Sequence, residues 1–239
     1  MANHKGSKGE SLLTPMVSIC CATYQQQSTI EQTLSSFLAQ KTEFPFEVLV
    51  HDDASTDRTP EIVRDFASRY LDVVKPILQT ENQYSKAVPI NETFNFPRVK
   101  GKYIALCEGD DYWTDDTKLQ QQVAYMEAHP DCTFCFTNGV VHDLSGKQAD
   151  REFVPFYPSE AAWYSAADRD YTLGEITHLS FLPTATFLFP ARLLQTVPRE
   201  LLTKQCYHGD LRMKLFFTAA GYAHYVHAFT CVYRANFPG

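Results

Sequence analysis

Three carboxylates stand within four residues of this chain, at Glu108, Asp110 and Asp111. They follow a short run at residues 103–107 that is apolar at every position, as a strand buried on both faces of a sheet is. Like charges this close repel one another unless a cation or water intervenes. Carboxylate oxygens at the end of a buried strand suit Mg²⁺ or Mn²⁺, which also bind phosphate. The alternative is a solvated loop that caps the next helix, and the aromatic pair at residues 112–113 favours a site.

Two further apolar runs also end in polar side chains. Thr23 and Tyr24 follow the first run, and Asp52 and Asp53 follow the second. In an open parallel sheet, ligands bind in the crevice beyond the carboxyl ends of the strands. We therefore expect these two clusters and the carboxylates after residue 107 to converge on one crevice. That convergence is a stronger argument than any one cluster.

The elements that would position these clusters alternate along the first 140 residues. Strands are predicted at residues 16–22, 46–50, 73–78, 103–107 and 132–141, and helices at residues 29–40, 59–70 and 115–129. Ser28 and Glu31 have the spacing of a capping box for the first helix, and Pro76 argues against an interior position for the third strand. The alternation predicts an α/β protein with a doubly wound, mostly parallel central sheet.

The second half of the chain is less regular. Residues 143–172 hold aromatic and proline residues without a period, which indicates a long loop. Aromatic side chains such as Tyr157 and Trp163 could stack on a sugar ring, but packing beneath the loop is favoured. Further elements are predicted as a strand at residues 185–189, a short helix at 190–197, a helix between Asp210 and Gly221, and a strand at 222–233.

Length and charge narrow the class of protein. The 239 residues, 44% of them hydrophobic, are enough to bury a substantial core. We expect a mobile tail at residues 1–15 and one domain over residues 16–239. The formal net charge of −7 argues against nonspecific binding to nucleic acid, although a metal could mask carboxylates locally for a phosphate-bearing ligand.

The seven cysteines predict a reducing compartment. Cys132 and Cys135 form a single CxxC without a second pair, so strand packing is favoured over zinc. No signal-peptide core is visible, and no run approaches the roughly 18 apolar residues that a membrane helix needs. We therefore expect a cytoplasmic protein without a transmembrane segment.

Taken together, the motifs resemble family 2 glycosyltransferases of the GT-A fold. The resemblance rests on the strand at residues 17–24, the strand and loop at 47–57, the acidic motif at 108–111 and the segment at 208–210. It covers residues 16–140 well and only parts of the remainder. It implies a nucleotide-sugar-binding half at residues 16–140 and a smaller acceptor-side half at residues 141–239.

The resemblance also implies roles for individual residues. By position, Asp53 would accept a hydrogen bond from the nucleotide base, Ala22, Thr23 and Tyr24 would form the wall of the base pocket, Asp110 would lie near the ribose and the metal, Asp111 would bind the metal, and Asp210 would be the general base. Asp53 and Asp210 could instead cap helices. Glu108 is open between a supporting and a solvated role. His227 and Arg234 stand where some members contact metal or diphosphate, although a His among aromatic residues is more often packed.

The reaction that the resemblance implies is an inverting sugar transfer. The donor would be a nucleotide diphosphate sugar, UDP-linked in preference to GDP- or TDP-linked, with Mn²⁺ or Mg²⁺ as cofactor. The acceptor would be a hydroxyl of a saccharide or lipid-linked saccharide in the synthesis of cell-surface polysaccharide or glycolipid. Such work fits a cytoplasmic enzyme with peripheral contact to the inner face of the membrane. The Arg- and Trp-containing motif of processive synthases is not evident, which disfavours a processive polymer synthase.

Two other classes of function compete with this reading. A sugar-phosphate nucleotidyltransferase also uses a doubly wound sheet and a metal, but it needs a Gly-rich basic loop after the first strand to hold a triphosphate. Residues 23–27 contain neither Gly nor Lys. A noncatalytic nucleotide-sugar-binding protein is the second alternative, and it would have no use for Asp111 and Asp210 in one crevice.

Overall fold

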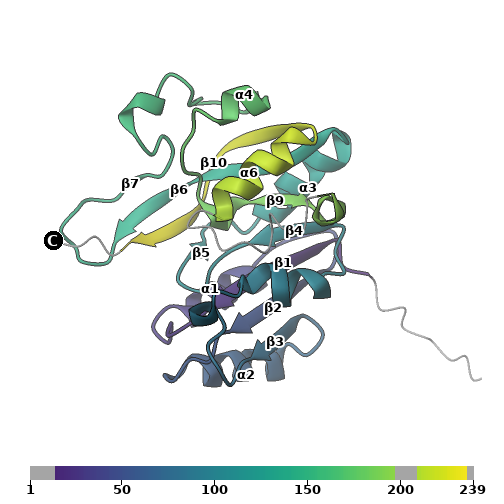
Figure 1. Ribbon diagram of the computed structural model, residues 1–239, viewed down its shortest axis with the longest axis vertical. Helices are drawn as coiled ribbons and strands as arrows, with labels where there is room; N and C mark the ends of the chain where they lie inside the picture. The colour runs from purple at the N-terminus through teal and green to yellow at the C-terminus, as the bar shows by residue number, and fades with distance from the viewer. Residues whose placement is uncertain (1–13, 197–208, 236–239) are drawn as a thin grey trace, which may run out of the picture.

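A computed structural model describes residues 14–196 and 209–235 of the chain. Its strands form one mixed sheet in the order β3-β2-β1-β4-β9-β6-β10-β5, with β7 paired to β6 and β8 paired to β10. Figure 1 shows β3 and α2 at one end of the longest axis and α4 at the other. The mixed α/β sheet is mostly parallel, as the sequence predicted.

The amino-terminal half is a parallel sheet with helical crossovers. β1 (Val17–Thr23) pairs in parallel with β2 (Phe46–Asp52) and β4 (Tyr103–Leu106), and β2 pairs with β3 (Val74–Leu78). α1 (Ile30–Leu38), α2 (Thr59–Arg69) and α3 (Lys118–Ala128) connect or flank these strands. β3 is the edge strand, which accommodates Pro76 because an edge position tolerates the missing N–H.

The predicted capping box at Ser28 and Glu31 is wrong. α1 begins at Ile30 after Thr29, and no side chain caps it. The Thr29 hydroxyl donates instead to the Gly109 carbonyl at 3.0 Å. The start of α1 is therefore shaped by its contact with the acidic loop and not by local capping.

The carboxyl-terminal half adds antiparallel pairing. β9 (Leu188–Pro190) runs antiparallel to β4 and β6 (Cys132–Asp143), while β10 (Tyr222–Ala235) is parallel to β6 and antiparallel to β5 (Tyr112–Trp113). The short β7 (Arg151–Glu152) and β8 (Arg169–Tyr171) fall within the predicted loop. In the predicted strand at 185–189, residues 185–186 belong to a 3₁₀ turn, Thr184–Thr186, and residues 188–189 belong to β9. The predicted helix at 190–197 is a 3₁₀ segment, Ala191–Gln195.

Two hydrophobic cores cover the two faces of the sheet. Ile19 and Cys21 of β1 face a core shared with α1, α2 and α3, while Cys20 between them faces the other core. That second core contains α4 (Leu173–Ile176) and α6 (Gly209–Ala219), where Phe217 stacks on Phe189 of β9. Strands buried on both faces explain the apolar runs without alternation.

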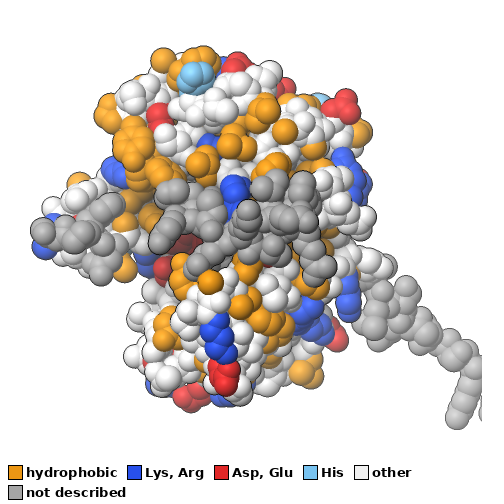
Figure 2. All heavy atoms as spheres, viewed as in Figure 1, with side chains coloured by type: hydrophobic (Ala, Val, Ile, Leu, Met, Phe, Trp, Pro, Cys, Tyr) orange, Lys and Arg blue, Asp and Glu red, His pale blue; other side chains and the backbone are white. Residues whose placement is uncertain are grey.

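The six described cysteines are buried free thiols, as expected, and Cys206 lies outside the described residues. Cys132 and Cys135 are part of β6. Charged side chains of both signs are scattered over the face in Figure 2. No helix within residues 14–196 and 209–235 has the length and apolar character needed to cross a membrane. The expected tail at residues 1–15 lies almost wholly outside the described residues.

The direction of the strands determines where a site can form. β1, β4, β6 and β10 all point the same way, since β4 and β6 each run antiparallel to β9. Their carboxyl ends therefore meet at one edge of the sheet. That edge carries Thr23, Glu108 and residues 233–235.

Candidate active site

The acidic loop at residues 108–111 joins β4 to β5. The Gly109 N–H donates to the Ala22 carbonyl at 2.9 Å, which fixes the loop against the end of β1. The Thr33 hydroxyl of α1 lies 2.6 Å from the Asp111 carbonyl and 3.0 Å from the Gly109 carbonyl. Backbone contacts with β1 and α1 thus hold the loop in place and leave its carboxylates to point elsewhere.

Position 109 requires glycine because the side chains of Gln26 and Thr23 lie close to its backbone. A Cβ at this position would lie 2.3 Å from Gln26 Oε1 and 2.7 Å from Thr23 Oγ1. Thr23 Oγ1 itself donates to Gln26 Oε1 at 2.6 Å. The side chains of Thr23 and Gln26 therefore leave no room for a Cβ at position 109.

The carboxylates of the loop lie in an unfavourable electrostatic environment. Asp111 is 1% exposed, and burial, followed by the charges of Glu108 and Asp110, raises its pKa well above the usual range. Burial and Asp110 likewise raise the pKa of Glu108, with a smaller contribution from Asp210. The pKa of Asp110 is also raised, chiefly by burial. Raised pKa values from burial and like charge indicate a cluster that a cation would stabilise.

The carboxylates of the acidic loop fit a divalent ion that takes some ligands from the protein and the others from phosphate and water. Within the described parts of the chain, no three His, Cys, Asp or Glu side chains converge to hold a metal by themselves. Mg²⁺ and similar ions often take only one or two carboxylates and complete their shell with water and substrate phosphates. The buried Asp111 carboxylate beside Asp110 meets that smaller requirement.

Two adjoining cavities open beside the acidic loop. The larger, about 550 Å³, contains all three loop carboxylates and the aromatic side chains Phe153, Phe156, Phe181 and Tyr233. The smaller, about 330 Å³, is lined by Ala22 and Tyr84 on one side and by the start of α6 on the other. Glu108, Thr184 and Asp210 line both cavities. The two spaces therefore meet at carboxylates from two distant segments.

Asp210 lies in the first described turn of α6 and is half-buried. It lines the same cavity as Asp111, which lies 99 residues earlier in the chain. The sequence-predicted base and metal ligand are thus brought together. His208 of the same motif lies outside the described residues.

Asp53 occupies a different position from the one expected of an open base pocket. It is 3% exposed, and its carboxylate accepts the backbone N–H groups of Gln83 at 2.8 Å and Tyr84 at 2.9 Å. It lines neither of the two cavities, whereas Tyr84 lines the smaller one. Asp53 therefore shapes the wall of that cavity through the loop at residues 83–84.

The other residues predicted for the base pocket are only partly gathered. Ala22 lines the smaller cavity, while Thr23 and Tyr24 line neither cavity. Tyr24 is 48% exposed beside the buried Thr23. Asp52 holds its own loop by accepting the Ser55 hydroxyl at 2.5 Å.

Arg234 braces the acidic loop from β10. Its backbone N–H donates to Asp111 Oδ1 at 3.0 Å, and its guanidinium donates to the Asp110 carbonyl and to Gln32 Oε1. The guanidinium also lies 4.5 Å from the centre of the Tyr112 ring. Arg234 therefore links β10, the acidic loop and α1.

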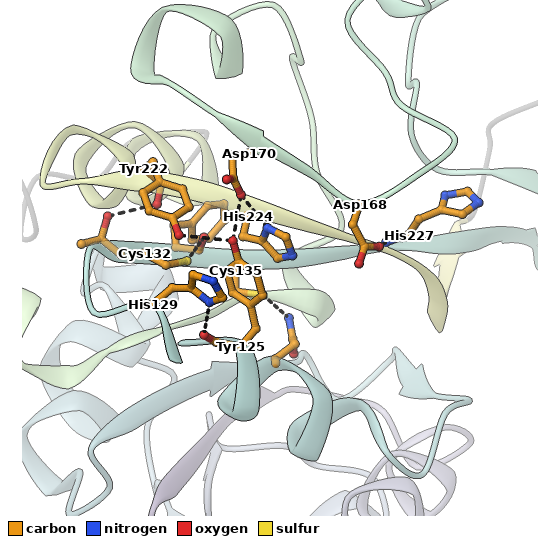
Figure 3. Close-up of polar contacts among 12 residues, drawn as sticks. Tyr125, His129, Cys132, Cys135, Asp168, Asp170, Tyr222, His224 and His227 are labelled. Atoms are coloured by element: carbon orange, nitrogen blue, oxygen red, sulfur yellow. Dashed lines mark hydrogen bonds and ion pairs between the residues drawn. The ribbon is translucent and has the colours of Figure 1, made fainter. Parts of the chain in front are cut away.

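His227 does not belong to this site. It is exposed, lines neither cavity, and its Nδ1 lies 3.2 Å from the Tyr225 hydroxyl. Its backbone N–H donates to Asp168 at 2.8 Å, and Figure 3 shows this contact apart from the cluster around His224. Its ring centre lies 6.0 Å from that of Tyr225 and 6.2 Å from that of Phe229, so His227 stands among aromatic residues at the surface.

Sequence reasoning missed several residues of the site. Thr184 is shared by both cavities, and Arg212 lines the smaller one. Arg151 lines the larger cavity with its guanidinium 5.1 Å from the Phe156 ring centre. The only sequence signal for Arg212 was its position two residues after Asp210.

In the irregular loop, Trp163 stacks on His178, so its side chain packs within the protein, as was favoured.

Known proteins are similar to this chain over much of its length. The family described as Glycosyl transferase family 2 matches residues 18–187. An uncharacterised protein of Mycobacterium tuberculosis is 38% identical over 176 residues, which are 72% of this chain and 46% of that protein. The Escherichia coli protein WfaP, named a UDP-Glc:alpha-D-GlcNAc-diphosphoundecaprenol beta-1,3-glucosyltransferase, is 34% identical over 139 residues, 58% of this chain and 49% of WfaP. The chain spans about half the length of these curated relatives.

Solved structures show the same fold. Staphylococcus aureus TarS in complex with UDP-GlcNAc aligns with a TM-score of 0.66 at 18% identity, covering 93% of this chain and 59% of that one. The mannosyltransferase PcManGT of Pyrobaculum calidifontis, in complex with GDP-Man and Mn²⁺, aligns with a TM-score of 0.57 at 20% identity, covering 94% and 57%.

Proposed function

Because this chain belongs to glycosyltransferase family 2 and has the GT-A fold, we propose that it transfers a sugar from a nucleotide diphosphate donor to an acceptor hydroxyl with inversion. The observation that carries the proposal is that Asp111 and Asp210 line one cavity. A metal ligand and a general base must face the same reacting centre, and two distant segments of the chain meet that condition here.

In this proposal the two cavities divide the substrates. The smaller one, between Ala22 and Asp210, would take the donor, and the larger one, with its aromatic wall, would take the acceptor. Asp53, Thr23 and Tyr24 would form the base end of the donor site. A carboxylate has about four acceptor positions, so Asp53 can hold its two backbone N–H groups and still accept from a base.

The residues present fit a Mn²⁺ or Mg²⁺ ion, with Asp111 as the protein ligand and Asp110 beside it. When bound, such an ion neutralises charge on the departing diphosphate. Asp210 removes the proton of the acceptor hydroxyl. At the same time the hydroxyl oxygen bonds to the anomeric carbon, and the bond from that carbon to the diphosphate oxygen breaks. A positioned base contributes about 100- to 10,000-fold to such a step. Attack from the face opposite the leaving group inverts the anomeric centre and needs no enzyme nucleophile.

A UDP-sugar is the favoured donor. The name of WfaP specifies a UDP-Glc donor and a diphosphate-linked acceptor, and TarS binds UDP-GlcNAc, while PcManGT binds GDP-Man. We extend this to a saccharide or lipid-linked saccharide acceptor in surface-glycan synthesis, in the cytoplasm at the inner face of the membrane. We also propose that residues 16–140 supply the main part of the donor site and residues 141–239 the main part of the acceptor site, with Asp210 of α6 lining both cavities.

The test is a screen of nucleotide sugars by thermal shift, with and without Mn²⁺, followed by measurement of free nucleotide released. A ligand that binds only the folded protein raises its Tm. We expect a UDP-sugar to raise Tm in the presence of Mn²⁺ and to yield free UDP, even by slow hydrolysis. Stabilisation without any turnover would favour the noncatalytic binding protein, and turnover of a nucleoside triphosphate with a sugar phosphate would favour the nucleotidyltransferase.

A further inference from the structure

The smaller cavity has an unbalanced set of charges. Glu92, Glu108 and Asp210 contribute carboxylates to its lining, and Arg212 is the one Lys or Arg side chain among its described lining residues. A diphosphate that entered this cavity would add further negative charge. Repulsion between like charges at these distances is costly unless cations oppose it, so the cavity needs positive charge on more than one side.

The two sources of positive charge would lie on different walls. A divalent ion at Asp111 would stand on the side of the acidic loop, in the larger cavity that adjoins this one. Arg212 stands on α6, whose residues Gly209 and Met213 also line the smaller cavity. A ligand between the loop and α6 would therefore meet a cation on each side.

Glu92 lies near Arg212 in the same cavity. It belongs to the π-helical turn Asn91–Asn95, which packs against β1 and β2. Burial raises the pKa of Glu92, and the charge of Arg212, which lines the same cavity, opposes that rise. Attraction between these opposite charges favours a guanidinium that stays within the cavity.

We propose that Arg212 binds the diphosphate of the nucleotide donor and that Glu92 positions its guanidinium. The chemistry fits because a guanidinium is planar and always charged and donates two parallel hydrogen bonds to phosphate oxygens. This inference rests on the proposed function, since it assigns a residue to the donor cavity. It also places a phosphate contact and the proposed base, Asp210, within three residues of one helix, so that donor binding and base placement share one element.

The alternative is that Arg212 and Glu92 only stabilise the fold. A structural pair would change Tm in either variant and would leave the preference for phosphate-bearing ligands intact. A diphosphate site would change the affinity for UDP and leave the affinity for uridine unchanged. The two ligands share the base and ribose, so the ratio of their affinities isolates the phosphate contact.

The experiment is titration calorimetry of UDP, uridine and inorganic pyrophosphate with Mn²⁺, on the full chain. The variants are Arg212→Met, Arg212→Lys and Glu92→Gln, with Arg64→Met, an exposed arginine on α2, as the matched control for loss of one charge. Tm of each variant shows whether it folds. Loss of a charged hydrogen-bonded contact weakens binding by about 10- to 100-fold.

We expect R212M to weaken UDP and pyrophosphate binding by about 10- to 100-fold and uridine binding by less than about twofold. R212K should retain part of the affinity, because lysine keeps the charge but not the planar fork, and E92Q should weaken UDP less than R212M. Unchanged UDP binding in folded R212M and R212K, or an equal loss for UDP and uridine, would overturn the inference while leaving the proposed function in place. Wild-type protein that binds neither UDP nor pyrophosphate would overturn both.

Discussion

Two clusters of titratable side chains lie toward opposite ends of β6 and β10. One is at the carboxyl ends, where Asp111 and Asp210 line a cavity with Glu108. The other is near the amino ends, where His224 and Tyr125 stack with ring centres 3.4 Å apart. Both clusters are built on the same sheet, and both contain buried polar groups, so they separate what the fold needs from what a site needs.

The amino-end cluster satisfies most of its polar groups internally. Asp170 accepts from His224 Nδ1 at 2.7 Å and from the Tyr125 hydroxyl at 3.0 Å, and Tyr125 also lies 3.2 Å from the Tyr222 hydroxyl (Figure 3). His129 stacks on the other face of Tyr125 at 4.1 Å. The atom of this group without a partner among the described residues is His224 Nε2.

In the part of the chain that the structure describes, the carboxyl-end cluster leaves its carboxylates without enough positive charge or hydrogen-bond donors to balance them. Its carboxylates raise one another's pKa, and the Arg234 backbone N–H opposes this only in part. Cavities adjoin it, whereas none of the three cavities described for the molecule is lined by His224 or Asp170. Unsatisfied like charge beside open space indicates a place for a ligand, while satisfied polar groups without a cavity indicate packing.

The largest effect is expected from Asp210→Asn. Loss of the proposed base should lower kcat by about 100- to 10,000-fold while UDP affinity stays within about twofold. Release of UDP measures the first and calorimetry the second. Asp65→Asn, on the exposed face of α2, should leave kcat unchanged. Wild-type turnover by D210N would refute the base assignment.

Asp111→Asn should act on the metal and the donor together. We expect Mn²⁺-dependent UDP binding to fall by about 10-fold or more, because the amide cannot supply the carboxylate charge. Asp116→Asn, five residues on and partly exposed in an ion pair with Lys41, is the control. If D111N binds Mn²⁺ and UDP as the wild type does, the acidic loop is not the metal site.

Gly109→Ala should disturb the loop without changing its charge. The new Cβ would clash with Gln26 and Thr23, so the loop must shift, at a cost of about 1–3 kcal/mol in the free energy of unfolding and with a smaller loss of activity than in D210N. Gly174→Ala is the control, since its Cβ would meet nothing nearer than Thr172 Oγ1 at 4.0 Å. Equal behaviour of the two variants in denaturant melts would contradict the close approach.

The raised pKa values also make stability depend on pH. Folded Asp111 and Glu108 hold protons above the usual carboxyl pKa of about 4, so the folded state binds more protons than the unfolded state. The metal-free protein should therefore lose stability as the pH rises from about 5 to 8, by about 3 °C in Tm or more. Mn²⁺ should restore more Tm at the higher pH. The metal-free wild type could instead gain Tm as the pH rises from 5 to 8, and gain more than D111N does. That result would contradict the raised pKa values of Asp111 and Glu108.

The smallest effect on function is expected from Asp170→Asn at the paired cluster. Loss of its hydrogen bonds should cost about 0.5–1.5 kcal/mol of stability, and kcat and UDP affinity should stay within about twofold. Thermal melts and the UDP-release assay measure the two. A loss of activity near that of D210N would show that the contrast between the clusters does not separate site from packing.

The sequence predicted the parts of the fold that follow local rules. Residues 17–23 and 46–52 form long strands buried on both faces, and their apolar runs show it. The apolar run at residues 185–189 indicated a strand near β9, but it could not show that this strand has three residues and runs antiparallel to β4 and β6. Its antiparallel insertion makes the sheet mixed, which strand–helix alternation alone could not indicate.

The site was predictable where a motif carried it. Asp111 and Asp210 line one cavity as expected, with Asp111 in the loop after the carboxyl end of β4 and Asp210 in the first described turn of α6. Asp53 did not join them directly, since its carboxylate binds the backbone of residues 83–84. Thr184 and Arg212 have no motif and enter the site only through tertiary packing.

The central claim is that Asp111 and Asp210 meet at one cavity where a cation and a sugar donor bind. A crystal structure of the protein with Mn²⁺ and UDP, with the ion located by its anomalous scattering, tests this directly. We expect Mn²⁺ about 2.0–2.3 Å from an Asp111 oxygen and from phosphate oxygens, with Asp210 facing the same cavity. Mn²⁺ and UDP on another surface, away from Asp111, would contradict the account.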